Sequence, residues 1–250
     1  MLFLINRLTA LLNHWFAPLL VAVMTRLGIH IAHPTRPINN TLALELVVMT
    51  LLLLYFIAAR LSLSVEKPGA IQHTAESIHG FVSSQAEQIV GPGSEPYVPY
   101  ATTIGLFVLT CNCFGLLPGF ETPTANPVVP LGIAILTFIY YNWQGVKAQG
   151  AVGYFKHFLG PIWWISWLIF PIEVISHLAR MLSLTIRLYA NMFASDLLTL
   201  AFFSLIPIGI PVIFLGLHLF VSLIQAYVFM LLTLIYLSQA TSHDEEAAHA

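Results

Sequence analysis

Ionisable side chains interrupt the apolar C-terminal third of the sequence at regular intervals. Glu173, Arg180 and Arg187 are separated by seven residues each, which places them on one stripe of a helix. His177 and Ser183 lie close to the same stripe. Ionisable groups are costly in an apolar surrounding and normally face a protein interior, a wet cavity or a partner. The stripe therefore predicts a functional surface.

A second polar stripe follows on the next apolar segment, where His218 and Gln225 are also seven residues apart. We expect the two segments to be antiparallel helices joined by a short turn at residues 204–211. If Arg187 and Gln225 lie level, Asp196 is ~13 Å and His218 ~10 Å from that level toward the turn. Asp196 and His218 should therefore form one polar cluster.

Glu173 and His177 should form a second cluster, ~15–20 Å from Arg187 in the other direction. A continuous line of proton carriers would leak protons, but an arginine remains protonated and cannot relay a proton. Its charge repels a hydronium ion and lowers the pKa of a nearby carboxyl group, which forces proton release. The pattern predicts two half-channels that open to opposite faces and are separated by Arg187.

Each of these side chains also has a structural interpretation. Arg187 could close an ion pair with an internal acid, and Asp196 and His218 could be a structural polar pair. Arg180 could extend to the lipid headgroups, and Gln225 could make an ordinary interhelical hydrogen bond. The two residues of the second cluster could simply be solvated near a membrane boundary.

The composition requires a lipid surrounding. Of 250 residues, 58% are hydrophobic and only 8% are charged, whereas a soluble domain carries about 25% charged residues; the mean hydropathy is +0.85. The net charge of -2 gives no indication of a nucleic-acid partner. No phosphate-binding glycine loop, zinc-protease motif or nucleophile elbow is present. Cys111 and Cys113 lie in an apolar run and are interpreted as small hydrophobic side chains. We expect no cofactor and no metal site.

The apolar segments predict an all-α, polytopic membrane protein with about five transmembrane helices. A spanning helix needs about 20 apolar residues. The last two segments would reach roughly 50 Å, against a hydrocarbon core of ~30 Å, so they should be steeply tilted or bent. The predicted spans cover residues 41–61, 98–118, 128–143, 163–201 and 207–240.

A different pattern occupies residues 70–92, between the first two predicted spans. Apolar residues recur there at three- and four-residue steps, with polar residues between them, which is typical of an amphipathic helix on the membrane surface or against partners. The apolar face consists of Ile71, Ala75, Ile78, Val82 and Ile89.

The whole chain divides into three parts: an external N-terminal amphipathic segment (1–40), a single membrane domain (41–240) and a polar tail (241–250). Within the first, residues 8–28 predict a retained amphipathic or interfacial helix, with a cleaved signal peptide as the alternative. With five spans, four loop cations lie on one side of the membrane and three on the other: Arg60, Lys67, Lys147 and Lys156 against Arg7, Arg26 and Arg36. Because cytoplasmic loops carry an excess of lysine and arginine, this count favours an external N-terminus and a cytoplasmic tail.

Three motifs, in this order, resemble subunit a of F-type ATP synthases. They are Asn112–Ala125 (NCFGLLPGFETPTA), Ser183–Asp196 (SLTIRLYANMFASD), and His218 followed by Gln225–Leu237 (QAYVFMLLTLIYL). The resemblance covers roughly residues 40–240.

The resemblance implies that Arg187 is the essential stator arginine, facing the carboxylate of each passing c subunit, with Asn191 and Gln225 as polar neighbours. It implies a non-catalytic, multi-pass subunit in a bacterial inner membrane, with an organelle inner membrane as the alternative. The implied partners are the c-subunit ring, the b subunits of the peripheral stalk, the rest of the ATP synthase complex and membrane lipids.

The resemblance also implies that Asp196 and His218 belong to the external half-channel and Glu173 to the cytoplasmic one. The family usually has glycine where Ala190 stands and glutamate where Asp196 stands, and Asn126 replaces a frequent acid, so we expect no proton carrier there. The candidate proton-translocation residues are Arg187, Asp196, His218, Gln225, Glu173, Asn191, His177 and Ser183.

Rival functions make different predictions. A secondary transporter predicts an internal repeat with interrupted helices around a substrate pocket, and the last two segments show no repeat. An intramembrane enzyme predicts paired catalytic groups in one cavity, whereas these polar groups are spread over separate stripes. A structural scaffold leaves Arg187 without a role.

Overall fold

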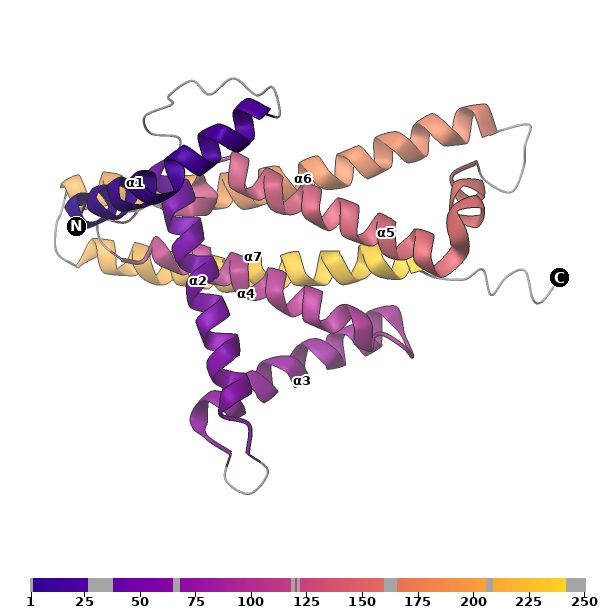
Figure 1. The fold of residues 1–250 in the computed structure, drawn as a ribbon, viewed down its shortest axis with the longest axis horizontal. Helices are drawn as coiled ribbons and strands as arrows, with labels where there is room; N and C mark the ends of the chain where they lie inside the picture. Colours follow the sequence, from indigo (N-terminus) through magenta and orange to yellow (C-terminus); the bar gives the residue numbers. More distant parts are fainter. Residues whose placement is uncertain are drawn as a thin grey trace.

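The structure is a computed structural model that describes residues 2–26, 38–64, 68–117, 120, 122–159, 166–205 and 209–241. Within these ranges the chain forms helices and no strand, which confirms the all-α fold class (Figure 1). In chain order, the helices are α1 (Leu2–Arg26), α2 (Asn40–Leu61), α3 (Ala70–Val90), the 3-10 helix η1 (Glu95–Tyr97), α4 (Val98–Phe114), the 3-10 helix η2 (Pro123–Ala125), α5 (Val128–Leu159), α6 (Ser166–Leu205) and α7 (Ile210–Thr241).

Several helices are long and apolar enough to cross a membrane. Among the described residues, four segments meet this condition by length and composition: Asn40–Leu61, Glu95–Phe114, Trp167–Ser204 and Pro211–Thr241. The chain is therefore a multi-pass membrane protein. Helix α5 covers the remaining predicted span, residues 128–143, and continues to Leu159 through a change of direction at Gly150, whose φ of 76° favours glycine.

The two C-terminal helices are longer than the bilayer core is thick. Helix α6 has 40 residues and α7 has 32, which correspond to about 60 and 48 Å. They run side by side in opposite directions, and α2 crosses them at a steep angle (Figure 1). Helices α6 and α7 therefore lie strongly inclined to α2.

The N-terminal part is attached to α2 by polar contacts. The side chain of Asn13 in α1 donates to the carbonyl of Ile38 and accepts from its amide, at 3.1 and 3.0 Å. Thr9 donates to Asn40 at 2.9 Å. In lipid, polar side chains satisfied in this way hold helices together.

Helix α3 is amphipathic and packs inward with one face. Its buried side chains join those of α4 and α7 in one hydrophobic cluster, so α3 lies against the membrane helices and leaves its polar face outside. The cluster consists of Val82, Ala86, Val98, Ala101, Met230 and Leu234.

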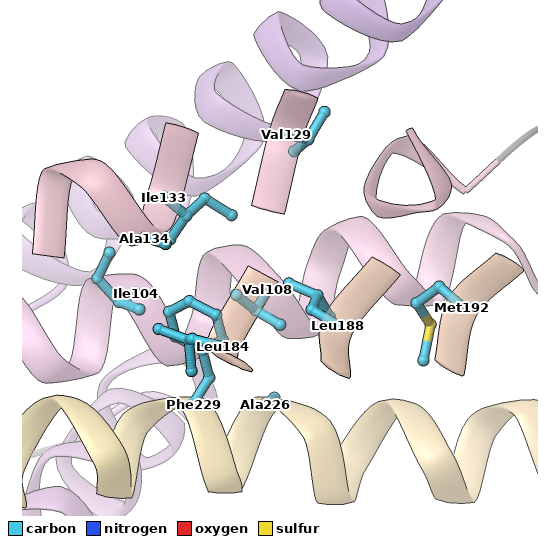
Figure 2. Close-up of a cluster of buried hydrophobic side chains, with 10 residues drawn as sticks. All are labelled: Ile104, Val108, Val129, Ile133, Ala134, Leu184, Leu188, Met192, Ala226 and Phe229. Atoms are coloured by element: carbon cyan, nitrogen blue, oxygen red, sulfur yellow. The ribbon is translucent and has the colours of Figure 1, made fainter. Parts of the chain in front are cut away.

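The central hydrophobic cluster decides which face of α6 is free. Leu184, Leu188 and Met192 repeat every four residues and are buried against α4, α5 and α7. Figure 2 shows these three side chains one after another along α6, with α7 alongside. Because lipid is as apolar as leucine, close van der Waals packing holds such a cluster together. Arg187 lies about 100° around the helix from the middle of this buried row, on a flank of α6 that is left exposed.

Candidate functional site

His218, on α7, is the most deeply buried ionisable group of the site, with a side chain 1% exposed. Its Nε2 lies 3.0 Å from the carbonyl oxygen of Asn112 in α4. Because a carbonyl only accepts hydrogen bonds, Nε2 carries a proton in this arrangement. Nδ1 lies 2.8 Å from Ser195 Oγ and 3.6 Å from Asp196 Oδ1. The nitrogen free to gain or lose a proton is therefore Nδ1, which faces Asp196.

Asp196 connects this buried histidine to the surface of the protein. Its side chain is 24% exposed, and its Oδ1 accepts a hydrogen bond from Thr122 Oγ1 at 2.9 Å. Thr122 precedes η2 in the connection between α4 and α5, so three separate segments meet at one carboxylate. The hydroxyl fixes the position of the carboxylate by donating to it.

Asn112 holds the inner wall of this cluster. Its Oδ1 accepts a hydrogen bond from Thr124 Oγ1, while its carbonyl faces His218. Its Nδ2 is buried and has no hydrogen-bond partner among the described residues. Buried amide donors are normally satisfied by protein or by ordered water, so this group can bind a water molecule within the cluster.

Gly115 allows these segments to approach each other. A Cβ atom at this position would overlap Thr122 Oγ1 and lie 2.9 Å from His218 Nε2. Its backbone is ordinary right-handed helix, with φ of -64° and ψ of -16°. The site therefore needs glycine for space, and not for an unusual backbone angle.

Arg187 lies on the exposed face of α6. Within the described part of the chain, no acidic group is in ion-pairing distance of it. Ser183, Ala190 and Ala194 are exposed on the same stripe, and their small side chains would let a partner approach the guanidinium closely. A closed internal ion pair does not form among the residues that the structure describes.

Asn191 and Gln225 link the two long helices beside this stripe. Asn191 Nδ2 donates to Gln225 Oε1 at 3.2 Å. Gln225 is 2% exposed, and its Nε2 has no partner in the described ranges. The pair makes the interhelical hydrogen bond that the sequence allows, and it leaves the second amide donor of Gln225 buried between the helices.

Glu173 and His177 form a separate cluster at the other end of α6. His177 Nδ1 lies 2.9 Å from the backbone oxygen of Glu173 and 3.5 Å from its Oε1. The ring centroid of His177 is 5.9 Å from that of Tyr141, on α5. Asp196 is 19 residues from His177, about 28 Å along the helix. The structure therefore separates the two predicted clusters, with Arg187 between them.

Arg180 is held by α7. Its Nη1 donates to Gln239 Oε1 at 2.6 Å, and its guanidinium carbon lies 5.5 Å from the centre of the Tyr236 ring, a cation–π geometry. Both contacts direct the Arg180 side chain toward α7 and not toward the lipid headgroups.

Sequence reasoning missed part of the site. Thr122, Thr124 and Gly115 lie in the first of the three motifs, but no helical spacing relates them to Asp196, which is 74 residues from Thr122. Ser195 directly precedes Asp196, yet its contact with His218 depends on the packing of α6 on α7. The sequence feature that could have pointed to Thr122, Thr124 and Gly115 is the motif at residues 112–125.

Comparison with known proteins assigns the family. The family model described as the ATP synthase A chain matches residues 41–238. A protein from Koribacter versatilis named ATP synthase subunit a is 54% identical over 238 residues, covering 95% of this chain and 97% of that protein. Proteins of the same name from Solibacter usitatus (45% over 213 residues, 85% and 91%) and Sulfurimonas denitrificans (41% over 179 residues, 71% and 80%) are also similar. The chain belongs to the ATP synthase A chain family.

Proposed function

We propose that this chain is the proton-translocating stator subunit of an F-type ATP synthase, in the inner membrane of a bacterium. The main support is the position of Arg187. It is exposed on α6, it has no acidic partner among the described residues, and it lies between two ionisable clusters. Family membership and the names of the relatives support the assignment. The chain makes and breaks no bond itself, and ATP chemistry belongs to the soluble part of the complex.

The external half-channel in this proposal ends at Asp196 and His218. A proton taken up by Nδ1 of His218 passes to Asp196, 3.6 Å away, and from there to a carboxylate of the c-subunit ring. Water bound by the free amide of Asn112 would extend this path into the buried cluster. A carboxyl group and an imidazole are suited to this exchange because both change protonation state near neutral pH when their surroundings shift them.

Arg187 then sets the direction in which protons are exchanged with the c-subunit carboxylates. As the ring turns, the neutralised carboxyl groups pass through lipid and return from the other side. The nearby guanidinium lowers the pKa of the returning carboxyl by one to three units, so the proton leaves toward Glu173 and His177. Each charge that crosses the membrane potential supplies ~2.3 kcal/mol per 100 mV, which drives the rotation.

Disulfide crosslinking tests whether the stripe of Arg187 faces the rotor. Ala190→Cys and Ala194→Cys are exposed one and two turns from Arg187. Each should crosslink on oxidation to a cysteine placed beside the c-subunit carboxylate, in complexes whose native Cys111 and Cys113 are replaced by alanine. The product is measured by its shift on a denaturing gel.

Ile135→Cys is the control, because Ile135 is 40% exposed on α5, outside the stripe. It should give no crosslink to the c subunit. Equal product from the control, or none from either alanine position, would contradict the proposed rotor surface.

Substitutions in the external cluster should reduce pumping only in part. A positioned acid or base contributes about 10²–10⁴-fold to proton transfer. Because water can bridge part of a half-channel, we expect Asp196→Asn or His218→Ala to lower the ATP-driven pumping rate roughly tenfold. Quenching of a pH-sensitive dye in inverted vesicles measures this rate. Unchanged rates in both variants would assign Asp196 and His218 a structural role.

A further inference from the structure

A cavity of about 530 Å³ lies where the end of α2, the helix α3 and the start of α4 meet. Its volume falls within the range of small-molecule sites. Phe56, Ala59, Ile78 and Leu106 contribute apolar walls. Because α2 and α4 are membrane spans and α3 is amphipathic, the cavity is placed where lipid headgroups meet the hydrocarbon.

Two opposite charges stand on the wall of this cavity. Arg60 is in the last turn of α2, and Glu76 is on α3; both are exposed and both line the cavity. Among the described residues they form no ion pair with each other. The Oε1 atom of Glu76 accepts a hydrogen bond from Gln72 Nε2 at 2.8 Å, which fixes the carboxylate. A guanidinium binds phosphate well, and a carboxylate binds a primary ammonium.

A second cavity continues the first into the apolar part of the bilayer. It measures about 590 Å³ and shares Phe56 and Thr103 with the first. On α2 it is lined from Phe56 back to Met49, which is 11 residues, or about 16 Å, from Arg60 in the first cavity. The two cavities together provide a charged end and an apolar extension.

We infer that this pair of cavities binds one phospholipid whose headgroup carries a phosphate and a primary ammonium. Arg60 binds the phosphate, and Glu76 binds the ammonium. One acyl chain passes Phe56 and fills the second cavity. The lipid bridges α2, α3 and α4, away from the residues of the proton path, so the inference does not depend on the proposed function.

Native mass spectrometry of the full chain in detergent, titrated with single phospholipids, tests this inference. Phosphatidylethanolamine should bind at least tenfold more tightly than phosphatidylcholine, because a quaternary ammonium cannot donate hydrogen bonds to Glu76. Glu76→Gln should remove this preference, and Arg60→Gln should weaken binding of both lipids at least tenfold. Equal affinity of the unmodified chain for the two lipids would overturn the inference.

A cavity-filling variant provides a second test that does not rely on charge. Gly80 lines the first cavity, and a Cβ there would meet no atom within 4 Å. Gly80→Leu should therefore fill the cavity, favour the helix and abolish lipid retention. Gly132→Leu, on α5 and equally open, is the control and should retain lipid. Lipid binding by Gly80→Leu at the level of this control, or a peptide chain crosslinked at Gly80→Cys in the lipid-free complex, would assign the cavity to another occupant.

Discussion

Replacing Arg187 with alanine is expected to lower ATP-driven proton pumping in inverted membrane vesicles by about 10- to 10³-fold. In the proposed mechanism the guanidinium lowers the pKa of each returning c-subunit carboxyl by one to three units, so its removal should slow proton release by about 10- to 10³-fold. The same charge separates the clusters at Glu173 and Asp196. Its loss should also raise the passive proton conductance of vesicles stripped of the soluble sector. A pH-sensitive dye measures both quantities.

Arg180→Ala is the control for this experiment. It removes a guanidinium seven residues away on the same helix, but one that already contacts Gln239 and Tyr236. We expect this variant to keep most of the pumping activity. Pumping retained by Arg187→Ala would contradict the proposed role of its charge. Equal loss in both variants would mean that the loss comes from the stability of α6 and not from the charge of Arg187.

The arrangement of the long helices could be predicted because helical periodicity is a local property. Seven-residue spacing placed Glu173, Arg180 and Arg187 on one stripe. The antiparallel register placed Asp196 level with His218, and their side chains lie 3.6 Å apart. Arg187 is exposed beside the buried row of Leu184, Leu188 and Met192, about 100° around the helix from its middle.

The ends of elements were harder to predict than their existence. The sequence predicts a short span over residues 128–143, because Asn142, Gln144 and Lys147 then make the chain polar. Helix α5 nevertheless continues to Leu159. A helix needs satisfied backbone groups but not apolar side chains once it leaves the hydrocarbon, so loss of hydrophobicity does not mark its end. Pro118 and Gly119, which the sequence places in the turn after the second span, lie outside the described residues.

The loop contribution to the site could not be predicted at all from spacing. Thr122 reaches Asp196, and the carbonyl of Asn112 reaches His218, across 74 and 106 residues of sequence. Such contacts depend on how α4 packs against α6 and α7. They also explain why a residue without a functional side chain, Gly115, belongs to the site.

Gly115→Ala is expected to lower ATP-driven pumping by up to about tenfold, as much as the loss of His218 itself, since a displacement of about 1 Å can remove a functional group's contribution to the rate. The added Cβ would overlap Thr122 Oγ1 and press on the ring of His218, 2.9 Å away. Neither side chain can move without breaking its hydrogen bond to Asp196 or to the carbonyl of Asn112. The right-handed backbone of Gly115 suits alanine, so helix formation itself should not suffer.

Gly105→Ala, within α4, separates this steric effect from a general effect of replacing a glycine in or next to this helix. A Cβ at Gly105 would lie 3.5 Å from Met230 Cβ, an ordinary van der Waals contact. This variant should therefore pump at the rate of the unmodified protein, at equal abundance in the membrane. If the two variants pump equally, the close approach of Thr122 and His218 does not control proton transfer. If only Gly115→Ala fails, the connection between α4 and α5 is a part of the proton path, and the absence of a side chain at Gly115 is what keeps Nδ1 of His218 within reach of Asp196.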